Sequence, residues 1–222
     1  MALQGIILDV DGTLVLSNDA HAQAWVDAFV ESGYDVPFDK VRSLIGMGGD
    51  QLMPKIIPGL TDEEGDGKVI SKRRKELLIN HYGPTLGSTK GARELLSHMQ
   101  QAGLKLIIAS SATSEELKVL LKAAQLDELL KDVEKTSSND AEASKPAPDI
   151  VEVALNKIQL EPSQVVMLGD TPYDIESAKG AEVGVIALRS GGFDDTQLAG
   201  ALAIYDDPAD LLAHYEQSPL AN

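Results

Sequence analysis

Short hydrophobic runs alternate with amphipathic stretches along the chain from about residue 90 onward. The hydrophobic runs have the length of strands, and the amphipathic stretches repeat their apolar positions at helical spacing. Strands are predicted at residues 104–109, 165–168 and 183–188, with weaker ones near Val133 and Ala203, and the clearest helices at 114–125 and 148–158. This alternation predicts an α/β fold with a doubly wound parallel sheet, a Rossmann-like core.

The region between residues 17 and 87 has a different pattern, with helical periodicity and no convincing strand. Trp25 and Phe29 belong to one apolar stripe, and apolar residues between 44 and 56 indicate further short helices. We therefore expect a helical cap domain, residues 17–87, inserted after the first strand of an α/β core made of residues 1–16 and 88–222.

A longer helix of the inserted region is expected to begin at Thr61, which has capping-box spacing to Glu64. Its apolar face continues towards Gly83, although two glycines weaken its first turns. The Gly83-Pro84 pair cannot easily continue a helix and marks the exit from the inserted region.

The chain has 19 basic and 35 acidic residues and a formal charge of −16. Such a charge repels nucleic acid and anionic lipid, so we expect neither a nucleic-acid nor a membrane partner. A site for a phosphorylated substrate would need a metal ion and lysines to reverse the local charge. There is no cysteine, which excludes disulfides and thiolate chemistry. No signal-like or membrane-spanning stretch is visible, so a cytoplasmic protein is expected.

Two aspartates follow an early strand in the order Asp-Val-Asp-Gly-Thr, from Asp9 to Thr13. Ligands bind at the carboxyl ends of strands in an open α/β sheet, and residues two apart in a strand point the same way. Paired carboxylates favour a hard cation such as Mg²⁺, with one carboxylate as nucleophile and the other as proton shuttle. The spacing alone also fits a turn with two solvated aspartates, whereas a calcium-binding EF-hand loop needs other residues after Gly12.

Hydroxyl and lysine side chains follow later elements. Ser110 and Ser111 lie between a predicted strand and a helix, where a hydroxyl and backbone N–H groups can hold a phosphate. A serine-rich helix cap is the simpler alternative. Lys145 lies in a Ser-Lys-Pro-Ala-Pro turn before another helix. An isolated lysine is usually a solvated surface charge, but one held by this turn could neutralise both a nucleophile and a phosphate.

A second acidic cluster, Asp170 and Asp174, follows the predicted strand at residues 165–168. Asp170 would complete a Mg²⁺ site, and Asp174, one helical turn later, could hold Lys145 or a metal-bound water. Asp170 alone is also a plausible helix cap. Four signals at four strand ends are together far more specific than any one of them.

In order and spacing, these residues resemble the four motifs of the haloacid dehalogenase superfamily, at residues 9–13, Ser110, Lys145 and residues 169–174. The resemblance covers essentially the whole chain and implies Asp9 as nucleophile and Mg²⁺ ligand. It implies Asp11 as general acid/base and, through its carbonyl, a metal ligand, with Asp170 as third ligand. The residues implied to bind the phosphoryl group are Gly12, Ser110, Ser111 and Lys145, with Thr13 and Asp174 supporting the site from behind.

The aspartate at position 11 resembles phosphatases and phosphomutases rather than dehalogenases or phosphonatases. His21 and Trp25 fit the pattern of β-phosphoglucomutase, but residues 46–50, where that family carries an arginine, contain no cation. Residues 169–174 look more like phosphoglycolate phosphatases. We expect a Mg²⁺-dependent phosphatase that hydrolyses a small phosphorylated metabolite, a sugar phosphate or phosphoglycolate-like acid, through an aspartyl phosphate. A mutase is the alternative, and a non-catalytic phosphate-binding protein is disfavoured because no part of the machinery is missing.

Three cap residues are candidate substrate contacts. His21 is equally compatible with packing at the hinge beside Trp25. Lys75 belongs to a basic run at residues 72–75, which is either a solvated helix face or a source of attraction for an anionic substrate. Gly48 lies in a loop expected over the active site. The apolar stripes serve a core or a dimer interface equally well, so monomer and homodimer both stay open.

Overall fold

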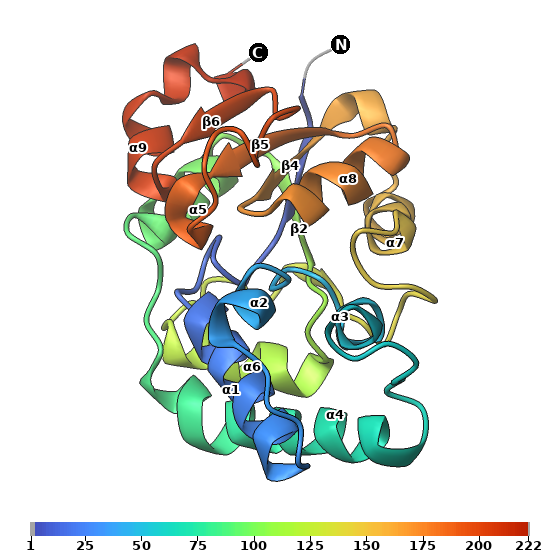
Figure 1. Cartoon of the computed structure of the whole chain (residues 1–222). Coiled ribbons are helices and arrows are strands. Elements are labelled where there is room, and N and C mark those ends of the chain that lie inside the picture. The colour runs from blue at the N-terminus through green and yellow to red at the C-terminus, as the bar shows by residue number, and fades with distance from the viewer. Residues whose placement is uncertain (1–2, 222) are drawn as a thin grey trace.

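The computed structural model describes residues 3–221, which form a six-stranded sheet with helices on both faces (Figure 1). The outer ends of the expected core, residues 1, 2 and 222, lie outside the described residues. All strands are parallel and follow the order β3-β2-β1-β4-β5-β6. They are β1 (Gly5–Leu8), β2 (Lys105–Ala109), β3 (Glu134–Thr136), β4 (Val165–Gly169), β5 (Gly184–Leu188) and β6 (Ala203–Tyr205). The predicted fold class is therefore confirmed, including the two weak strands.

The central strand β1 sends its side chains alternately into two hydrophobic layers. Ile6 and Leu8 face one layer and Ile7 faces the other, because successive residues of a strand point to opposite faces. The helices are α5 (Ala92–Gln101), α6 (Ser114–Ala123) and α9 (Pro208–Ala213) on the first face, and α7 (Asp149–Ile158) and α8 (Pro172–Gly180) on the second. Burial on both faces explains the continuous hydrophobic runs.

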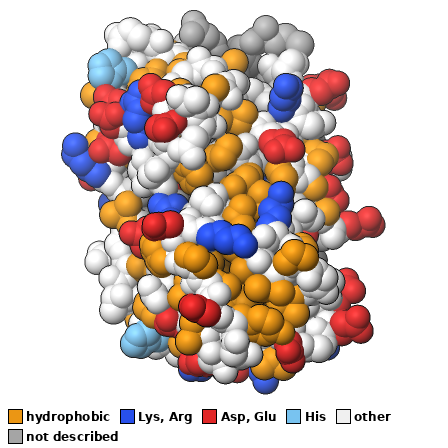
Figure 2. Space-filling view, in the orientation of Figure 1, with side chains coloured by type: hydrophobic (Ala, Val, Ile, Leu, Met, Phe, Trp, Pro, Cys, Tyr) orange, Lys and Arg blue, Asp and Glu red, His pale blue; other side chains and the backbone are white. Residues whose placement is uncertain are grey.

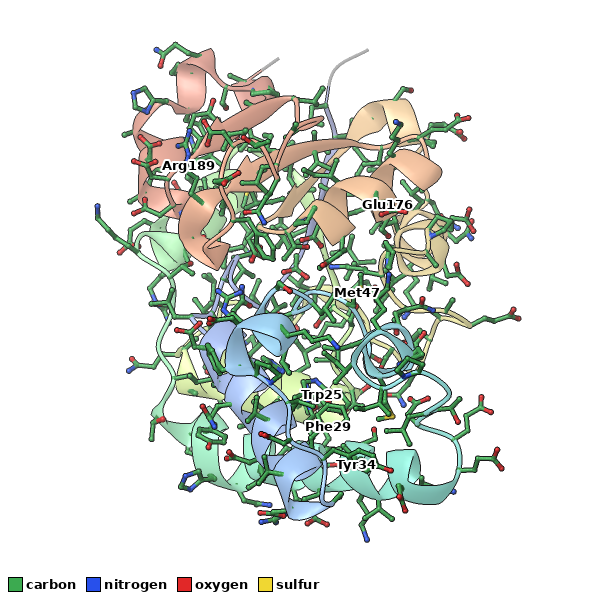
Figure 3. All side chains as sticks on the ribbon, in the orientation of Figure 1. Trp25, Phe29, Tyr34, Met47, Glu176 and Arg189 are labelled. Carbon is green, nitrogen blue, oxygen red and sulfur yellow. The ribbon has the colours of Figure 1, made fainter. Side chains whose placement is uncertain are left out.

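The chain between β1 and α5 is helical and gathers in the lower half of Figure 1. It contains α1 (Asn18–Glu31), α2 (Phe38–Arg42), α3 (Gly49–Ile56), α4 (Gly65–Leu77), the π-helix η1 (Leu78–Tyr82) and the 3₁₀ turn η2 (Gly83–Thr85). We call residues 18–85 the helical segment. It buries a hydrophobic cluster of its own, in which the rings of Trp25 and Phe29 stack with centroids 5.7 Å apart (Figure 3). That it forms a domain bounded at residues 17 and 87 stays a prediction.

The predicted start of the helix at Thr61 is wrong. Helix α4 begins at Gly65 rather than at Thr61, and its N-cap residue Glu64 makes no side-chain capping bond. The reason lies at Gly67, where a Cβ atom would lie 1.8 Å from the carbonyl oxygen of Thr61. The chain at Thr61 therefore crosses closely over the first turn of the helix and is not part of it. The helix expected around Ile45 is also missing, because α2 ends at Arg42 and Ile45 lies in the following turn.

Four further 3₁₀ turns complete the structure: η3 (Pro162–Gln164), η4 (Arg189–Gly191), η5 (Tyr215–Gln217) and η6 (Pro219–Ala221). Figure 2 shows acidic side chains along the right-hand edge of the visible face and hydrophobic ones gathered in its lower half. Within residues 3–221, no helix combines the length and the apolar character needed to cross a membrane.

Candidate active site

The carboxyl ends of β1, β2 and β4 bring the predicted site residues together where the sheet meets the helical segment. Strand β1 is hydrogen-bonded to β2 on one side and to β4 on the other. Asp9, Ser110 and Asp170, the residues that follow these strands, therefore become neighbours although they are far apart in the sequence. Lys145 joins them from the loop before α7.

Lys145 is the only lysine among the residues that the structure describes as buried, with 1% of its surface exposed. Its Nζ donates to Oδ1 of Asp9 at 2.5 Å, to Oδ1 of Asp174 at 2.7 Å and to the carbonyl of Ala109 at 3.0 Å. These three acceptors satisfy all three ammonium donors. Burial lowers the pKa of Lys145, but the charges of Asp174 and Asp9 outweigh it and raise this pKa above its usual value. The lysine is therefore charged and fixed against Asp9.

Three buried carboxylates form the acidic side of this cluster. Asp9, Asp170 and Asp174 each offer an oxygen within 4.8 Å of the others. Burial, reinforced by Asp174 and Asp11 and opposed by Lys145, raises the pKa of Asp9 to about 7. Burial, with Asp9 and Asp174, also raises the pKa of Asp170 well above its usual value. One lysine cannot balance three buried carboxylates, and their hard oxygen atoms suit a divalent cation such as Mg²⁺.

Asp170 is oriented by two side chains from the start of the chain. Thr13 donates its hydroxyl to Oδ1 at 2.8 Å, and Asn18 donates its amide to Oδ2 at 2.9 Å. Gly12 has φ +79°, and a Cβ atom there would lie 2.2 Å from Oδ2 of Asp170. A glycine is therefore required where the loop after β1 passes the carboxylate. Thr13 was predicted to support the site, whereas Asn18 was not.

Asp174 has two functions in the local structure. Its Oδ1 accepts from Lys145, and its Oδ2 accepts from the backbone N–H of Thr171 at 3.0 Å. Thr171 returns the bond as the N-cap of α8, accepting from the N–H of Asp174 at 3.2 Å. This capping box fixes the start of α8 and, through it, the position of Lys145. The expected contact between Asp174 and Lys145 is present.

Asp11 points away from the sheet towards the helical segment. Its Oδ1 accepts from Nε2 of His21 at 2.7 Å and from the hydroxyl of Ser17. A guanidinium can only donate, so the contact of Arg74 with Nδ1 of His21 leaves the Nε2–H to donate to Asp11. Burial opposes ionisation of Asp11, but the interactions with His21 and Ser17 outweigh it and lower its pKa.

Arg74 also reaches across to the sheet-bearing part of the molecule. Its Nη1 donates to the buried carboxylate of Glu116 on α6, and its guanidinium lies 5.2 Å above the ring of Trp25. Burial opposes ionisation of Glu116, yet Arg74 and the hydrogen bonds from Thr113 lower its pKa. Arg74 lies four residues after the buried Ile70 and was recognisable from that helical spacing, whereas its partner Glu116 was not.

A cavity of about 40 Å³ lies between the two groups of residues. Asp9, Asp11 and Ser111 line it from the sheet, and His21 and Arg74 line it from the helical segment. The loop around residues 45–49 closes it, with Met47 at the boundary between the two halves of the molecule in Figure 3. The cavity is thus faced by a carboxylate pair on one side and by a histidine and an arginine on the other.

The two candidate serines differ in position. The Oγ of Ser111 is buried, lines the cavity and has no hydrogen-bond partner among residues 3–221. The Oγ of Ser110 accepts from the N–H of Ala112 at 3.1 Å, and Ser110 does not line the cavity. Ser111 is therefore the serine whose hydroxyl is available to a ligand in this structure.

The two remaining cap candidates differ as well. Gly48 lines the cavity, and a Cβ atom there would lie 2.2 Å from the side chain of Ser144, so the loop approaches the lysine loop as closely as a glycine allows. Lys75 lies outside the cavity and pairs with Glu115 at 2.8 Å. Of the basic run, Arg74 alone lines it.

Comparisons with known proteins agree with this arrangement. The family model described as haloacid dehalogenase-like hydrolase matches residues 6–188. A phosphoglycolate phosphatase from Rhodospirillum rubrum is 28% identical, over 94% of this chain and 89% of that protein. Protein CbbY from Rhodobacter capsulatus is 30% identical, over 86% of this chain and 87% of that protein.

Two further matches differ in how much of the other protein this chain spans. The Arabidopsis thaliana protein named Suppressor of quenching 1, chloroplastic, is 29% identical over 85% of this chain, but the chain spans only 18% of that protein. The crystal structure of a hydrolase from Pseudomonas syringae superimposes with a TM-score of 0.86 at 28% identity, covering 96% of this chain and 98% of that one. The match includes the helical segment as well as the sheet.

Proposed function

This chain belongs to the haloacid dehalogenase-like hydrolase family as a phosphoric monoester hydrolase, and we propose that it uses Asp9 as nucleophile with a bound Mg²⁺ ion. The substrate is a small phosphorylated metabolite, and the enzyme acts in the cytoplasm. The observation that carries the proposal is the buried cluster in which Lys145 holds Asp9 at the wall of the cavity, beside Asp170 and Asp174.

Asp9 begins the proposed reaction. Its free carboxylate oxygen attacks phosphorus, the bond from phosphorus to the ester oxygen breaks, and an aspartyl phosphate forms. Lys145 keeps the carboxylate oriented, and the Oγ of Ser111 donates to a phosphoryl oxygen. A divalent cation held by Asp9, Asp170 and the carbonyl of Asp11 would offset the charge of the phosphoryl group.

Asp11 transfers the proton in both halves of the reaction. The arriving phosphoryl group raises the pKa of its carboxyl group, so the Asp11 carboxylate takes up a proton from solvent and then gives it to the departing alcohol. The resulting carboxylate takes a proton from water, the water oxygen bonds to phosphorus, and the bond to Asp9 breaks. Phosphate leaves, Asp11 releases its proton to solvent, and Asp9 and Asp11 regain their starting states. His21 holds Asp11 in place during both transfers.

The test is phosphate release from glucose 6-phosphate, 2-phosphoglycolate and p-nitrophenyl phosphate, with Mg²⁺ or with a chelator. Release is expected only with the metal, and Asp9→Asn should lower it at least about a thousandfold while leaving the circular dichroism spectrum unchanged. The exposed Asp132→Asn is the matched control and should retain full activity. Metal-independent release, or normal activity of Asp9→Asn, would refute the mechanism.

A phosphosugar mutase is the second candidate because Arg74 places a cation in the cavity opposite Asp9. The 46–50 loop itself contains no cation, as its sequence indicates, but Arg74 reaches the same cavity from α4. The two terminal nitrogens of Arg74 already contact Glu116 and His21, so neither is free for the second phosphate of a bisphosphate. This favours the phosphatase. Conversion of β-glucose 1-phosphate to glucose 6-phosphate with little phosphate release would instead establish the mutase.

A further inference from the structure

A second cavity continues from the active site along the boundary between the helical segment and the sheet. Trp25, Gly49, Arg74 and Ser111 line both cavities, so the cleft adjoins the cavity around Asp9 at these residues. The cleft measures about 310 Å³, which lies within the usual range of about 300–1,000 Å³ for small-molecule sites. It is therefore large enough for the alcohol part of a phosphomonoester whose phosphate occupies the smaller cavity.

The walls of the cleft are acidic on both sides. Asp50, Asp62 and Glu63 line it from the helical segment, and Glu142 lines it from the loop that leads to Lys145. Burial, with a contribution from Asp50 and Glu63, raises the pKa of Asp62, although a backbone hydrogen bond opposes the shift. The carboxylates on the helical-segment wall thus repel one another, and a second negative charge brought by a ligand would add to that repulsion.

The cationic side chain that lines the cleft is already paired with residues of the protein. Among the described residues that line it, Arg74 is the only lysine or arginine. One Nη of Arg74 contacts Glu116 and the other contacts His21. Glu116, the fifth carboxylate of the lining, is therefore neutralised, and the remaining four keep the cleft negative.

Two buried polar atoms point to the ligand's chemistry independently of this charge. Within residues 3–221, the Oγ of Ser111 and the Nε of Arg74 have no hydrogen-bond partner. Buried polar atoms in proteins are almost always paired, and an arginine nitrogen can only donate. Both residues line the two cavities, so oxygen atoms of a ligand that spans them would satisfy both atoms.

We propose that this cleft binds the alcohol part of the substrate and selects phosphomonoesters whose alcohol is cationic or uncharged, with hydroxyl or amino groups. Esters with a second anionic group, a carboxylate or another phosphate, are disfavoured. The acidic walls attract an ammonium group or accept hydrogen bonds from hydroxyl groups, whereas a second anion meets no free cation. This inference rests on the phosphatase activity proposed above and names its substrate class.

The first experiment compares glucosamine 6-phosphate, glucose 6-phosphate and glucose 1,6-bisphosphate, which share one ring and differ in charge. We expect binding to Asp9→Asn in the presence of Mg²⁺, measured by calorimetry, to weaken in this order, with the bisphosphate about tenfold weaker than glucose 6-phosphate. The difference should shrink as salt is added. Tighter or equal binding of the bisphosphate would overturn the inference.

The second experiment removes charge from both walls. Asp62→Asn combined with Glu142→Gln should bring the affinity ratio between glucosamine 6-phosphate and the bisphosphate at least about threefold closer to one. Glu94→Gln combined with Glu152→Gln removes two charges from the exposed helix surfaces of α5 and α7 and should leave the ratio unchanged. An equal shift in both double variants would assign the selectivity to net charge and refute the cleft.

Calorimetry on Asp9→Asn also separates the two proposals. If the ranking by charge is found but the wild-type protein releases no phosphate from any ester, the proposed activity is wrong and the selective cleft stands. If phosphate is released with Mg²⁺ but the ranking is absent or reversed, the activity stands and the cleft does not select by charge.

Discussion

The two sides of the active-site cavity are built differently. On the sheet side, Asp9 and Asp174 are buried and both accept from the buried Lys145. Asp9 follows β1, Asp174 lies in the first turn of α8, and Lys145 lies in the loop before α7. On the helical-segment side, His21 and Arg74 reach the site from helices that share no hydrophobic cluster with the sheet. One side is thus preorganised by a core, and the other is held in place by contacts across a boundary.

Several of the contacts across the boundary are hydrogen bonds or ion pairs. Besides the pair of Arg74 with Glu116, Tyr173 donates its hydroxyl to the carbonyl of Ser43 at 2.6 Å. Arg42 donates to the carbonyl of Gly191 at 2.5 Å, and the N–H of Ser144 donates to Asp50 at 3.2 Å. Polar contacts of this kind are typical of interfaces between parts of one chain, and here they hold the helical segment against the sheet-bearing part of the molecule.

The strongest test of this comparison is Lys145→Ala on the preorganised side. Removing the ammonium leaves Asp9 and Asp174 buried without their partner, so activity should fall at least about a thousandfold. The free energy of unfolding should fall by about 3 kcal/mol, measured by urea denaturation. Lys157→Ala, which breaks the half-exposed pair with Asp140, is the control and should cost less than about 1 kcal/mol. Unchanged stability of Lys145→Ala would show that the cluster is not a structural unit.

The sequence predicts more of the sheet side of the site than of the helical-segment side. Asp9, Ser110 and Asp170 follow hydrophobic runs, so predicting the strands also predicts that these residues meet. Lys75 and Arg74 are neighbours in one basic run, and only the phase of the helix, given by Ile70 four residues before Arg74, separates them. The pairing of Arg74 with Glu116 depends on how two separate helices pack against each other. The periodicity within either helix does not predict that packing.

Arg74→Gln tests the side held by boundary contacts. It removes the partner of buried Glu116 and the donor to His21, so kcat/KM should fall between about ten- and a hundredfold, less than for Lys145→Ala. Glu116→Gln keeps the capping box of α6 and serves as the second arm of a double-mutant cycle. If the double variant loses less transition-state stabilisation, calculated from kcat/KM, than the sum of the two single variants, Arg74 and Glu116 are coupled. Additive losses would mean that the two residues act separately.

The pH dependence of Mg²⁺ binding tests whether Asp9, on the sheet side, is a metal ligand. Asp9 has a pKa of about 7 in the folded protein and 3.8 as its ordinary value. Protonated Asp9 therefore favours the metal-free fold below pH 3.8, and this contribution disappears as the pH rises to about 7. Because the cation must displace that proton, Mg²⁺ should bind about tenfold more weakly at pH 6 than at pH 8.

The measurement is the rise in melting temperature caused by Mg²⁺ at the two pH values. It should be larger at pH 8, where the metal meets an ionised Asp9 and relieves the repulsion among the carboxylates. Asp9→Asn should show a smaller rise that changes little over this range. A larger rise at pH 6 in the wild-type protein would contradict the assignment of Asp9 as a ligand.

The smallest expected effect on activity is that of Lys75→Ala, which tests whether a contact across the boundary must be buried to affect activity. Lys75 pairs with Glu115 at 2.8 Å, joining the same two helices as the neighbouring pair of Arg74 with Glu116, but the side chains of Lys75 and Glu115 are 35% and 66% exposed. Exposed ion pairs contribute less than about 1 kcal/mol, so Lys75→Ala should leave kcat/KM within about twofold of the wild type in steady-state assays. Lys118→Ala, also on α6 but without an ion pair among the described residues, should match it. Lys75→Ala would match Arg74→Gln only if the exposed and the buried pairs between α4 and α6 were equivalent. An equal loss of activity in the two variants would therefore show that the buried contact of Arg74 with His21 has no special role at the site.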